Sequence, residues 1–327
     1  MCRCRRHLRA CCAFVGIENV VASLYWGGTL KGDDGDNRLT GGINPSTFMG
    51  RGGDDVLDGS NGHLDTASFA DASSGVTVDL AVNGPQDTGE GYDTLIGIEN
   101  LTGSAFADTL KGTSDVNVLT GGAGDDLLIG GGGYDRLDGG DGMDTVSYAD
   151  AAAGVQVGLA PGAYYNPGNL ISIEGLIGSA FADTLTGNDA ANALSGGAGN
   201  DLLIGGLGHD TLTGGAGNDV FDINAVADSG IGAGVRDVIT DFQPGLDDID
   251  LSDIDIDPGR KGDQGFSFIG TKDFSGRAGE LHYQTFDQPG TASDITVVSG
   301  DINGDHVADF EIEIAGILQL TKNDFLL

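Results

Sequence analysis

The sequence predicts an all-β protein: a solenoid of stacked parallel strands that ends in a small, mainly β C-terminal domain. Three observations predict it. A nonapeptide with glycines and an aspartate at fixed positions recurs in one frame. Glycine is abundant, at 59 of 327 residues, as a chain with a turn in every repeat requires. Beyond Asp222 the glycine period stops, and several segments alternate apolar and polar residues as strands do.

The composition limits the class of partner. The chain has 50 acidic against 15 basic residues, a formal charge of -35, so its surface repels phosphates and anionic lipid headgroups. This argues against nucleic acid and membrane surfaces as partners. Only 39% of the residues are hydrophobic, and chains with few hydrophobic residues and high charge stay disordered unless something external stabilises the fold. Multivalent cations are therefore the expected partners.

The repeats form blocks. The chain divides without a gap into five nonapeptides from Gly103 to Ser147 and into five more from Gly178 to Asp222. A third, degenerate block runs from Ser23 to about Ala67, and its last unit carries one extra residue. Six of the ten regular units fit GGxGxDxUx, where U is a large apolar residue, and they begin at Gly121, Gly130, Gly139, Gly196, Gly205 and Gly214.

Each unit predicts a turn followed by a short strand. GGxGxD is typical of a turn, because glycine adopts positive φ without steric cost and aspartate bonds to nearby amides. The following xUx predicts a strand, and two units make one coil of the solenoid. The U side chains then point inward as an apolar ladder, which in the second block consists of Leu110, Leu119, Leu128, Leu137 and Val146.

This apolar ladder cannot stabilise the fold alone. Burying one Leu-sized side chain contributes roughly 1.5–3 kcal/mol, whereas ordering the backbone of each residue in the unit costs roughly 1–2 kcal/mol. The aspartates of units two apart, such as Asp126 and Asp144, would also stack and repel each other. A bound cation addresses both problems. The carboxylates and glycine carbonyls are hard oxygen ligands, so several Ca²⁺ ions are predicted rather than Mg²⁺ or Zn²⁺.

Two structures without metal fit the sequence less well. A flexible linker keeps a composition but does not keep a fixed apolar position in each repeat. A metal-free solenoid, for example one that binds ice, would present a flat face of regularly spaced threonines, and the sequence contains no such pattern.

The repeats resemble the RTX, or hemolysin-type, calcium-binding repeats of proteins exported by bacterial type I secretion, whose fold is a parallel β-roll. The resemblance implies Ca²⁺ held between the turns of units n and n+2 by the aspartates at position six and by glycine carbonyls. The implied ligands are the carboxylates of Asp108, Asp126, Asp135, Asp144, Asp183, Asp201, Asp210 and Asp219 and the carbonyls of Gly121, Gly124, Gly139, Gly142, Gly196, Gly199, Gly214 and Gly217.

Some units depart from the pattern. Asn117 and Asn192 stand at position six, so their pairs with Asp135 and Asp210 lose one charge and are expected to bind more weakly. Asp55, in the degenerate block, is not counted among the expected ligands.

The C-terminal segment resembles the C-terminal domain of serralysin-type (peptidase M10) metalloproteases. RDVITDFQPGLDDIDLS from Arg236 and GDINGDHVADFEIEI from Gly300 carry the resemblance, and strands are predicted near Ile295–Val298 and Phe310–Ile314. In that family an acidic residue followed by three hydrophobic ones ends the chain as part of an export signal, and residues 324–327 match it. The resemblance implies the type I secretion machinery as a partner and an extracellular or cell-surface location.

A separate loop carries Asp301, Asn303, Asp305 and Asp309, oxygen ligands largely at alternate positions. It is not an EF-hand, because its glycine is fourth rather than sixth and its twelfth residue is not glutamate. An additional Ca²⁺ site and a hairpin turn with solvated acids both remain open.

No catalytic centre is expected. The chain has no HExxH zinc motif, no GxSxG nucleophile motif and no GxxxxGK[ST] phosphate loop. No segment approaches the roughly 20 apolar residues that cross a bilayer. Residues 1–16 hold all four cysteines and are expected to form an atypical leader outside the fold.

The expected organisation is a leader (1–16), a degenerate block with linker (17–102), a repeat block with linker (103–177), a second repeat block (178–222) and a secretion domain (223–327). The expected function is that of a secreted calcium-binding repeat protein that folds on Ca²⁺ after type I export. Two alternatives stay open. The chain could be the C-terminal folding and export part of a larger secreted metalloprotease, lipase or polysaccharide-modifying enzyme, or it could be a cell-surface or matrix adhesin.

Overall fold

The structure is a computed structural model that describes residues 18–22, 27–60, 62–160, 169–257, 264–287 and 294–327. In these ranges there is no α-helix, and the only helical element is the 3₁₀ turn η1 (Lys322–Asp324). The expected leader with its cysteines lies outside the described residues. The chain forms two compact units, Met1–Asp144 and Thr145–Leu327, which are described in turn.

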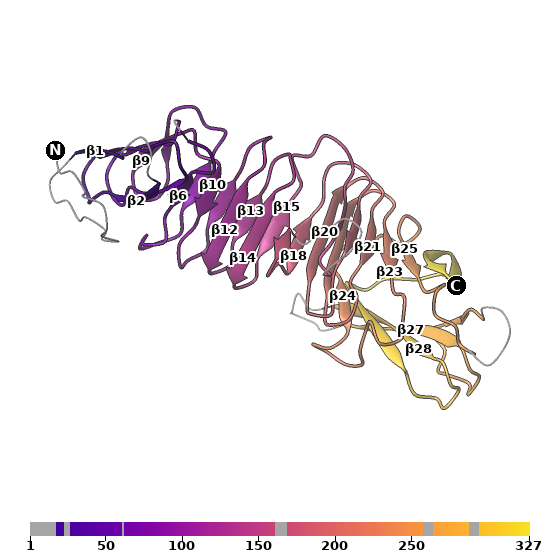
Figure 1. The fold of residues 1–327 in the computed structure, drawn as a ribbon. Coiled ribbons are helices and arrows are strands. Elements are labelled where there is room, and N and C mark those ends of the chain that lie inside the picture. Colours follow the sequence, from indigo (N-terminus) through magenta and orange to yellow (C-terminus); the bar gives the residue numbers. More distant parts are fainter. Residues whose placement is uncertain (1–17, 23–26, 61, 161–168, 258–263, 288–293) are drawn as a thin grey trace. The chain divides into compact units, whose positions relative to one another are not determined.

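One face of the first unit is a continuous stack of parallel strands in which β10, β12 and β14 lie side by side (Figure 1). Its strands pair in the order of the sequence. They are β2 (Gly28–Lys31), β4 (Ser46–Met49), β6 (Thr66–Ser68), β10 (Asn100–Thr102), β12 (Val118–Ala123) and β14 (Arg136–Asp141).

Two shorter parallel stacks complete the first unit. The first contains β1 (Asn19–Val21), β3 (Arg38–Thr40), β5 (Val56–Asp58) and β9 (Tyr92–Ile96), and the antiparallel strand β8 (Pro85–Asp87) forms its edge. The second contains β7 (Thr77–Asp79), β11 (Thr109–Lys111) and β13 (Leu127–Ile129). The degenerate block therefore forms strands in register with the regular repeats.

In the three-residue strands of the regular repeats, such as β11 and β13, the middle residue faces inward. Leu110 and Leu128 pair directly across neighbouring coils, and both are fully buried. Their flanking residues, Thr109, Lys111, Leu127 and Ile129, are half-buried. All five predicted inward side chains, Leu110, Leu119, Leu128, Leu137 and Val146, are at most 3% exposed, so the predicted apolar ladder is confirmed.

The turns need glycine for steric reasons. Gly124 has a φ of +109°, and a Cβ at this position would lie 2.5 Å from the carbonyl carbon of Phe106 in the preceding coil. A side chain there would both strain the backbone and prevent the coils from stacking.

The second unit repeats this arrangement with two stacks of parallel strands. One stack contains β15 (Thr145–Ser147), β18 (Gly175–Ile177), β20 (Ala193–Ala198), β22 (Thr211–Ala216) and β24 (Asp237–Ile239). The other contains β16 (Gln156–Gly158), β19 (Thr184–Thr186), β21 (Leu202–Ile204), β23 (Val220–Asp222), β25 (Asp248–Asp250) and β30 (Phe325–Leu326). A short strand, β17 (Leu170–Ile171), precedes β18. The parallel stacking thus continues past the last nonapeptide.

An antiparallel ribbon completes the second unit. Strands β27 (Glu280–Phe286) and β28 (Ile295–Asp301) pair antiparallel (Figure 1). Strand β29 (Phe310–Ala315) pairs antiparallel with β28, and β26 (Ser267–Gly270) lies at the edge beside β27. Strand β29 then pairs with β24 and joins the ribbon to the roll. The strands predicted near residues 295 and 310 are confirmed, as is the all-β parallel roll as a whole.

Candidate metal centre

The aspartates at position six form a row along each stack, always two residues before the inward apolar residue. We call this series of side chains the acidic row. In the first unit the amide of Asp108 donates to Oδ1 of Asp126 (2.8 Å), and the amide of Asp126 donates to Oδ1 of Asp144 (2.9 Å). In the second unit the same bonds join Asp183 to Asp201 (2.8 Å) and Asp201 to Asp219 (3.0 Å). The structure thus brings together each of the four expected Asp–Asp pairs.

The two pairs that contain asparagine have the same geometry. The amide of Asn117 donates to Oδ1 of Asp135, and that of Asn192 donates to Oδ1 of Asp210, both at 2.8 Å. The side chain of Asn117 also donates to the carbonyl oxygen of Glu99 (2.7 Å). These asparagines hold the coils in register but place one charge fewer in the row.

The second oxygen of many of these carboxylates is buried and has no hydrogen-bond partner within the described part of the chain. This holds for Oδ2 of Asp55, Asp65, Asp126, Asp201, Asp210, Asp219 and Asp237. A buried polar atom without a partner is costly, and in native proteins an ion often explains it. The donor set therefore fits a bound cation.

Glycine carbonyls converge on the same oxygens. A Cβ at Gly121 would collide with Oδ2 of Asp126 and lie 2.7 Å from the carbonyl oxygen of Gly139 in the next coil. At Gly196 a Cβ would collide with Oδ2 of Asp201 and lie 2.6 Å from the carbonyl oxygen of Gly214. The absent side chain leaves a small cradle that a carboxylate and a carbonyl share.

The glycines at the first position of the other repeats have their carbonyl groups in the same place. The carbonyl oxygen of Gly121 lies beside Oδ2 of Asp108, and that of Gly196 lies beside Oδ2 of Asp183. The fourth-position glycines behave differently. The carbonyl of Gly124 lies against Gly142, and that of Gly199 lies against Gly217, so these four residues stack turn on turn.

Burial disfavours the charged form of these carboxyls in the metal-free fold. Burial, together with the charges of Asp108 and Asp144, raises the pKa of Asp126 to about 7. Burial raises the pKa of Asp201 to about 6 and that of Asp210 to about 7. A divalent cation in the cradle would supply the charge that stabilises the ionised form.

Sequence analysis did not identify Asp237 and Asp247, which extend the acidic row into the C-terminal domain. Asp237 Oδ1 accepts a hydrogen bond from the amide of Asp210 (2.9 Å), and Asp247 Oδ1 accepts one from the amide of Asp219 (3.1 Å). Asp237 is fully buried, and burial raises its pKa to about 8. The signal was present, because both precede an inward isoleucine by two residues, but neither stands in a unit with the regular GGxGxD spacing.

A second row at position five was also not foreseen. Oδ1 of Asp125 accepts from the amide of Met143 (2.9 Å), and Oδ1 of Asn200 accepts from the amide of Asn218 (3.0 Å). Asp54 binds the amide of Tyr92 in the same way (3.0 Å). Asp or Asn at this position therefore ties successive turns together at the surface.

Asp55 has the environment of a regular position-six aspartate. Its Oδ1 accepts from the amide of Asn37 (2.7 Å), its own amide donates to Oδ1 of Asp93 (2.9 Å), and only 1% of the residue is exposed. Burial, with a contribution from the charge of Asp93, raises its pKa to about 7. The degenerate block has therefore kept the local structure of the site.

The C-terminal loop is held by its own hydrogen bonds. Asp301 accepts from the amides of Gly304 (2.6 Å) and His306 (3.0 Å), and Asp309 accepts from the amide of Ile302 (2.7 Å). Asn303 accepts from Asp305, and Asp305 from Val307. A Ca²⁺ site in this loop stays a prediction.

The described residues contain no group of three or more His, Cys, Asp or Glu side chains that could hold a metal ion. The arrangement in the turns instead combines carboxylates with main-chain carbonyls, which suits Ca²⁺ and not Zn²⁺. Nor do the described ranges contain a helix with the length and hydrophobicity needed to cross a membrane.

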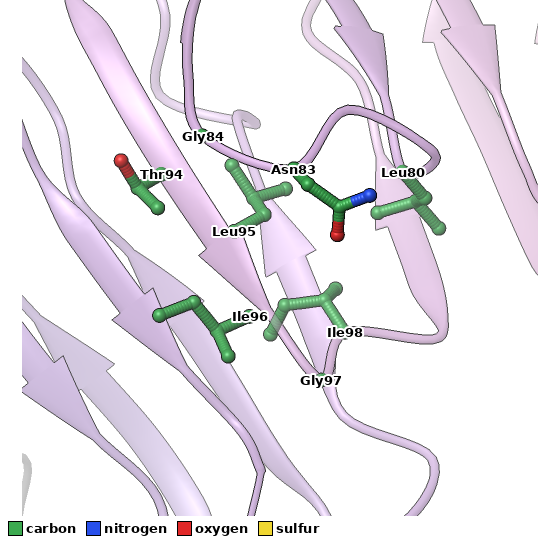
Figure 2. A pocket seen from close by; sticks show the side chains of 8 residues that line it. All are labelled: Leu80, Asn83, Gly84, Thr94, Leu95, Ile96, Gly97 and Ile98. Carbon is green, nitrogen blue, oxygen red and sulfur yellow. The ribbon is translucent and has the colours of Figure 1, made fainter.

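One concave site lies in the first unit, with a volume of about 330 Å³ (Figure 2). Its lining side chains are apolar or neutral polar groups, and none of them is titratable. It is lined by Leu80, Asn83, Gly84, Thr94, Leu95, Ile96, Gly97 and Ile98.

Comparisons with known proteins agree with the repeat pattern. Residues 29–63, 87–128, 102–137 and 120–149 match the model of the RTX calcium-binding nonapeptide repeat (4 copies). Residues 168–327 match the model of the peptidase M10 serralysin C-terminal domain. No curated protein matches the chain.

Among solved structures, the chain is similar to the AlgE6R3 subunit from the Azotobacter vinelandii mannuronan C5-epimerase. The identity is 22% and the TM-score is 0.27, over 68% of this chain and 78% of that chain. From the family matches and the geometry of the turns, the chain is a repeat protein that carries RTX calcium-binding nonapeptide repeats and a peptidase M10 serralysin C-terminal domain.

Proposed function

We propose that this protein is a secreted calcium-binding protein whose roll folds when Ca²⁺ binds after type I export. One observation carries the proposal. Along the acidic row, a buried carboxylate oxygen without a hydrogen-bond partner faces a glycine carbonyl of the next coil, as Asp126 faces Gly139 and Asp201 faces Gly214. These oxygens would hold the ion, with the neighbouring aspartate of the row contributing the second carboxylate.

The ion would act as a cross-link between coils. Asp126 and Asp144 are 18 residues apart, so in the unfolded chain they form no site. Binding free energy then becomes folding free energy. When bound, Ca²⁺ neutralises the stacked carboxylates, and the hydrogen bonds of the acidic row keep the two coils in register.

The same coupling suits an exported protein. Extracellular calcium modules bind with dissociation constants of roughly 10⁻⁴–10⁻³ M, far weaker than the 10⁻⁷–10⁻⁵ M of intracellular sensors. A roll of that affinity would stay unfolded in the cytosol and fold outside the cell. The match to a serralysin C-terminal domain supports type I export.

We also propose that this chain has no catalytic centre of its own. The two family models that match are those of a calcium-binding repeat and of a C-terminal domain. The aspartates at position six of the repeats are part of the acidic row. The chain's residues bind ions, and no proton transfer step is assigned to them.

Equilibrium dialysis of the full chain against radioactive Ca²⁺ tests the binding. The proposal predicts several bound ions per chain at millimolar Ca²⁺, retained in excess Mg²⁺. Binding of no ion, or equal displacement by Mg²⁺, would contradict it. Export is tested separately by expressing the chain with a type I exporter, with and without residues 324–327, and measuring protein in the medium.

A further inference from the structure

The last unit of the degenerate block contains an insertion that the fold accommodates. Residues 59–67 place one residue more between the first glycine and the aspartate than the regular repeat does, yet Asp65 occupies the regular place in the acidic row. Its inward neighbour Ala67 is fully buried and pairs with Leu101. The register is therefore restored before the strand begins.

The residue directly before Asp65, Leu64, has an unusual backbone conformation. It has a φ of +65°, a conformation uncommon for a bulky side chain, and it is 61% exposed. Packing of its own side chain therefore does not explain the strained backbone. Backbone strain of this kind is common where a ligand is held.

Asp65 is joined to the coils on both sides. Its Oδ1 accepts from the amide of Ser46 (2.6 Å), and its own amide donates to Oε2 of Glu99 (2.8 Å). Glu99 follows Gly97 and Ile98, which are labelled in Figure 2, and lies 34 residues beyond Asp65 in sequence. A glutamate from outside the nonapeptides thus takes the next place in the acidic row.

The remaining oxygen of Asp65 lies in a cradle of carbonyls. The residue is fully buried, and Oδ2 has no hydrogen-bond partner within the described ranges. A Cβ at Gly59 would lie 2.7 Å from this Oδ2 and 2.5 Å from the carbonyl oxygen of Gly97. A Cβ at Gly62 would lie 2.7 Å from Oδ2 and 2.9 Å from the carbonyl oxygen of Gly42.

We propose that Asp65 and Glu99, with the carbonyl oxygens of Gly42 and Gly97, form a further Ca²⁺ site between the degenerate block and the second block. This inference rests on the proposed function, because it assumes that the roll binds Ca²⁺. The donors are two carboxylates and two carbonyls, hard oxygens in a flexible set that suits Ca²⁺. The donors come from the turns before β4, β6 and β10, so the ion clamps three successive coils across the segment that separates the blocks.

Calcium stoichiometry of the full chain, measured by equilibrium dialysis, tests the site. Asp65→Asn and Glu99→Gln should each bind one Ca²⁺ fewer per chain than the wild type. Asp115→Asn removes one carboxylate from an exposed turn and is the matched control, which should bind the wild-type number. Far-UV circular dichroism at saturating Ca²⁺ checks folding. If Asp65→Asn does not fold, the stoichiometry of Glu99→Gln tests the site instead. Glu99 is only half-buried, so this substitution should leave the fold intact.

Asp126→Asn, measured in parallel, separates this inference from the proposed function. Loss of an ion in Asp126→Asn together with a wild-type number in Asp65→Asn and Glu99→Gln would overturn the site and leave the proposed function intact. Absence of Ca²⁺ binding by the wild type would overturn the proposed function itself.

Discussion

The main-chain amide of Asp126 donates a hydrogen bond to Oδ1 of Asp144, at 2.9 Å, one coil further along the roll. This bond fixes the orientation of one carboxylate and aligns two turns that are 18 residues apart. Repeated along the chain, it brings negative charges together in a buried row. The fold thus carries an electrostatic cost that a cation between the turns would remove.

Replacing Asp126 and Asp201 together by alanine should raise the Ca²⁺ concentration at the folding midpoint by roughly tenfold, the equivalent of about 1.4 kcal/mol. Each of the two aspartates bonds to a neighbour on either side in the acidic row, so each serves two proposed sites. The midpoint is read by circular dichroism. Asp115→Ala is the control, and an equal midpoint in both proteins would show that the ligands are assigned wrongly.

Gly196→Ala should destabilise the Ca²⁺-bound roll by about 1–3 kcal/mol, as overpacking does. Its Cβ would collide with Oδ2 of Asp201 and crowd the carbonyl oxygen of Gly214. Gly132→Ala is the matched control, because its Cβ would meet no heavy atom closer than 3.4 Å. Thermal unfolding in saturating Ca²⁺ compares the two. Equal melting temperatures would mean that the cradle at Gly196 is not tightly packed.

Acid should stabilise the metal-free fold. Burial raises the pKa of Asp126 and Asp210 to about 7 and that of Asp237 to about 8 in the fold, against about 3.9 in an unfolded chain. The stabilising contribution is complete below pH ~4 and is lost as the pH rises through these folded-state values. Metal-free protein should therefore show more β structure at pH 5 than at pH 8 by circular dichroism. A greater β signal at pH 8 would reverse the assigned sign.

Calcium binding should have the opposite pH dependence, because protons compete with the ion for the same carboxylates. Lowering the pH from 8 to 6 should raise the Ca²⁺ midpoint. Isothermal titration calorimetry in two buffers of different ionisation enthalpy would detect the released protons. A midpoint that does not change with pH would contradict carboxyl groups that are protonated in the metal-free fold.

Arg236→Ala should destabilise the C-terminal ribbon by about 1–3 kcal/mol, because it leaves two partly buried carboxylates without their hydrogen-bond donor. The Arg236 guanidinium contacts Glu311 at 2.8 Å and Glu313 at 2.6 Å, and it links β24 to β29. Arg136→Ala, which breaks an exposed pair with Asp138, should cost less than about 1 kcal/mol. Denaturant unfolding in saturating Ca²⁺ compares both variants, and similar losses would argue against the predicted role of Arg236.

The sequence was sufficient to predict the roll, since the position of the U residue in each nonapeptide fixes which side chains face inward. Leu110 and Leu128 illustrate this, because the repeat predicts both in the apolar ladder and both are fully buried. The relation between neighbouring coils was predictable wherever the spacing stayed at 18 residues. Asp126 and Asp144 meet because two regular units separate them.

The other members of the acidic row could not be predicted from the sequence, because their spacing is irregular. Asp237 follows Asp210 by 27 residues and Glu99 follows Asp65 by 34, so no fixed period connects them. Their places depend on which strands stack after an excursion of the chain, and this is decided by tertiary packing. At Glu99 the residue type differs as well, because a glutamate stands where the repeat has aspartate.

Circular dichroism of the protein during a Ca²⁺ titration, with Mg²⁺ as the control, tests the central claim most directly. The account predicts a cooperative gain of β signal with Ca²⁺ at roughly 10⁻⁴–10⁻³ M, and no such gain with Mg²⁺. Identical spectra in EGTA and in Ca²⁺ at neutral pH would contradict it, because the roll would then form without the ion.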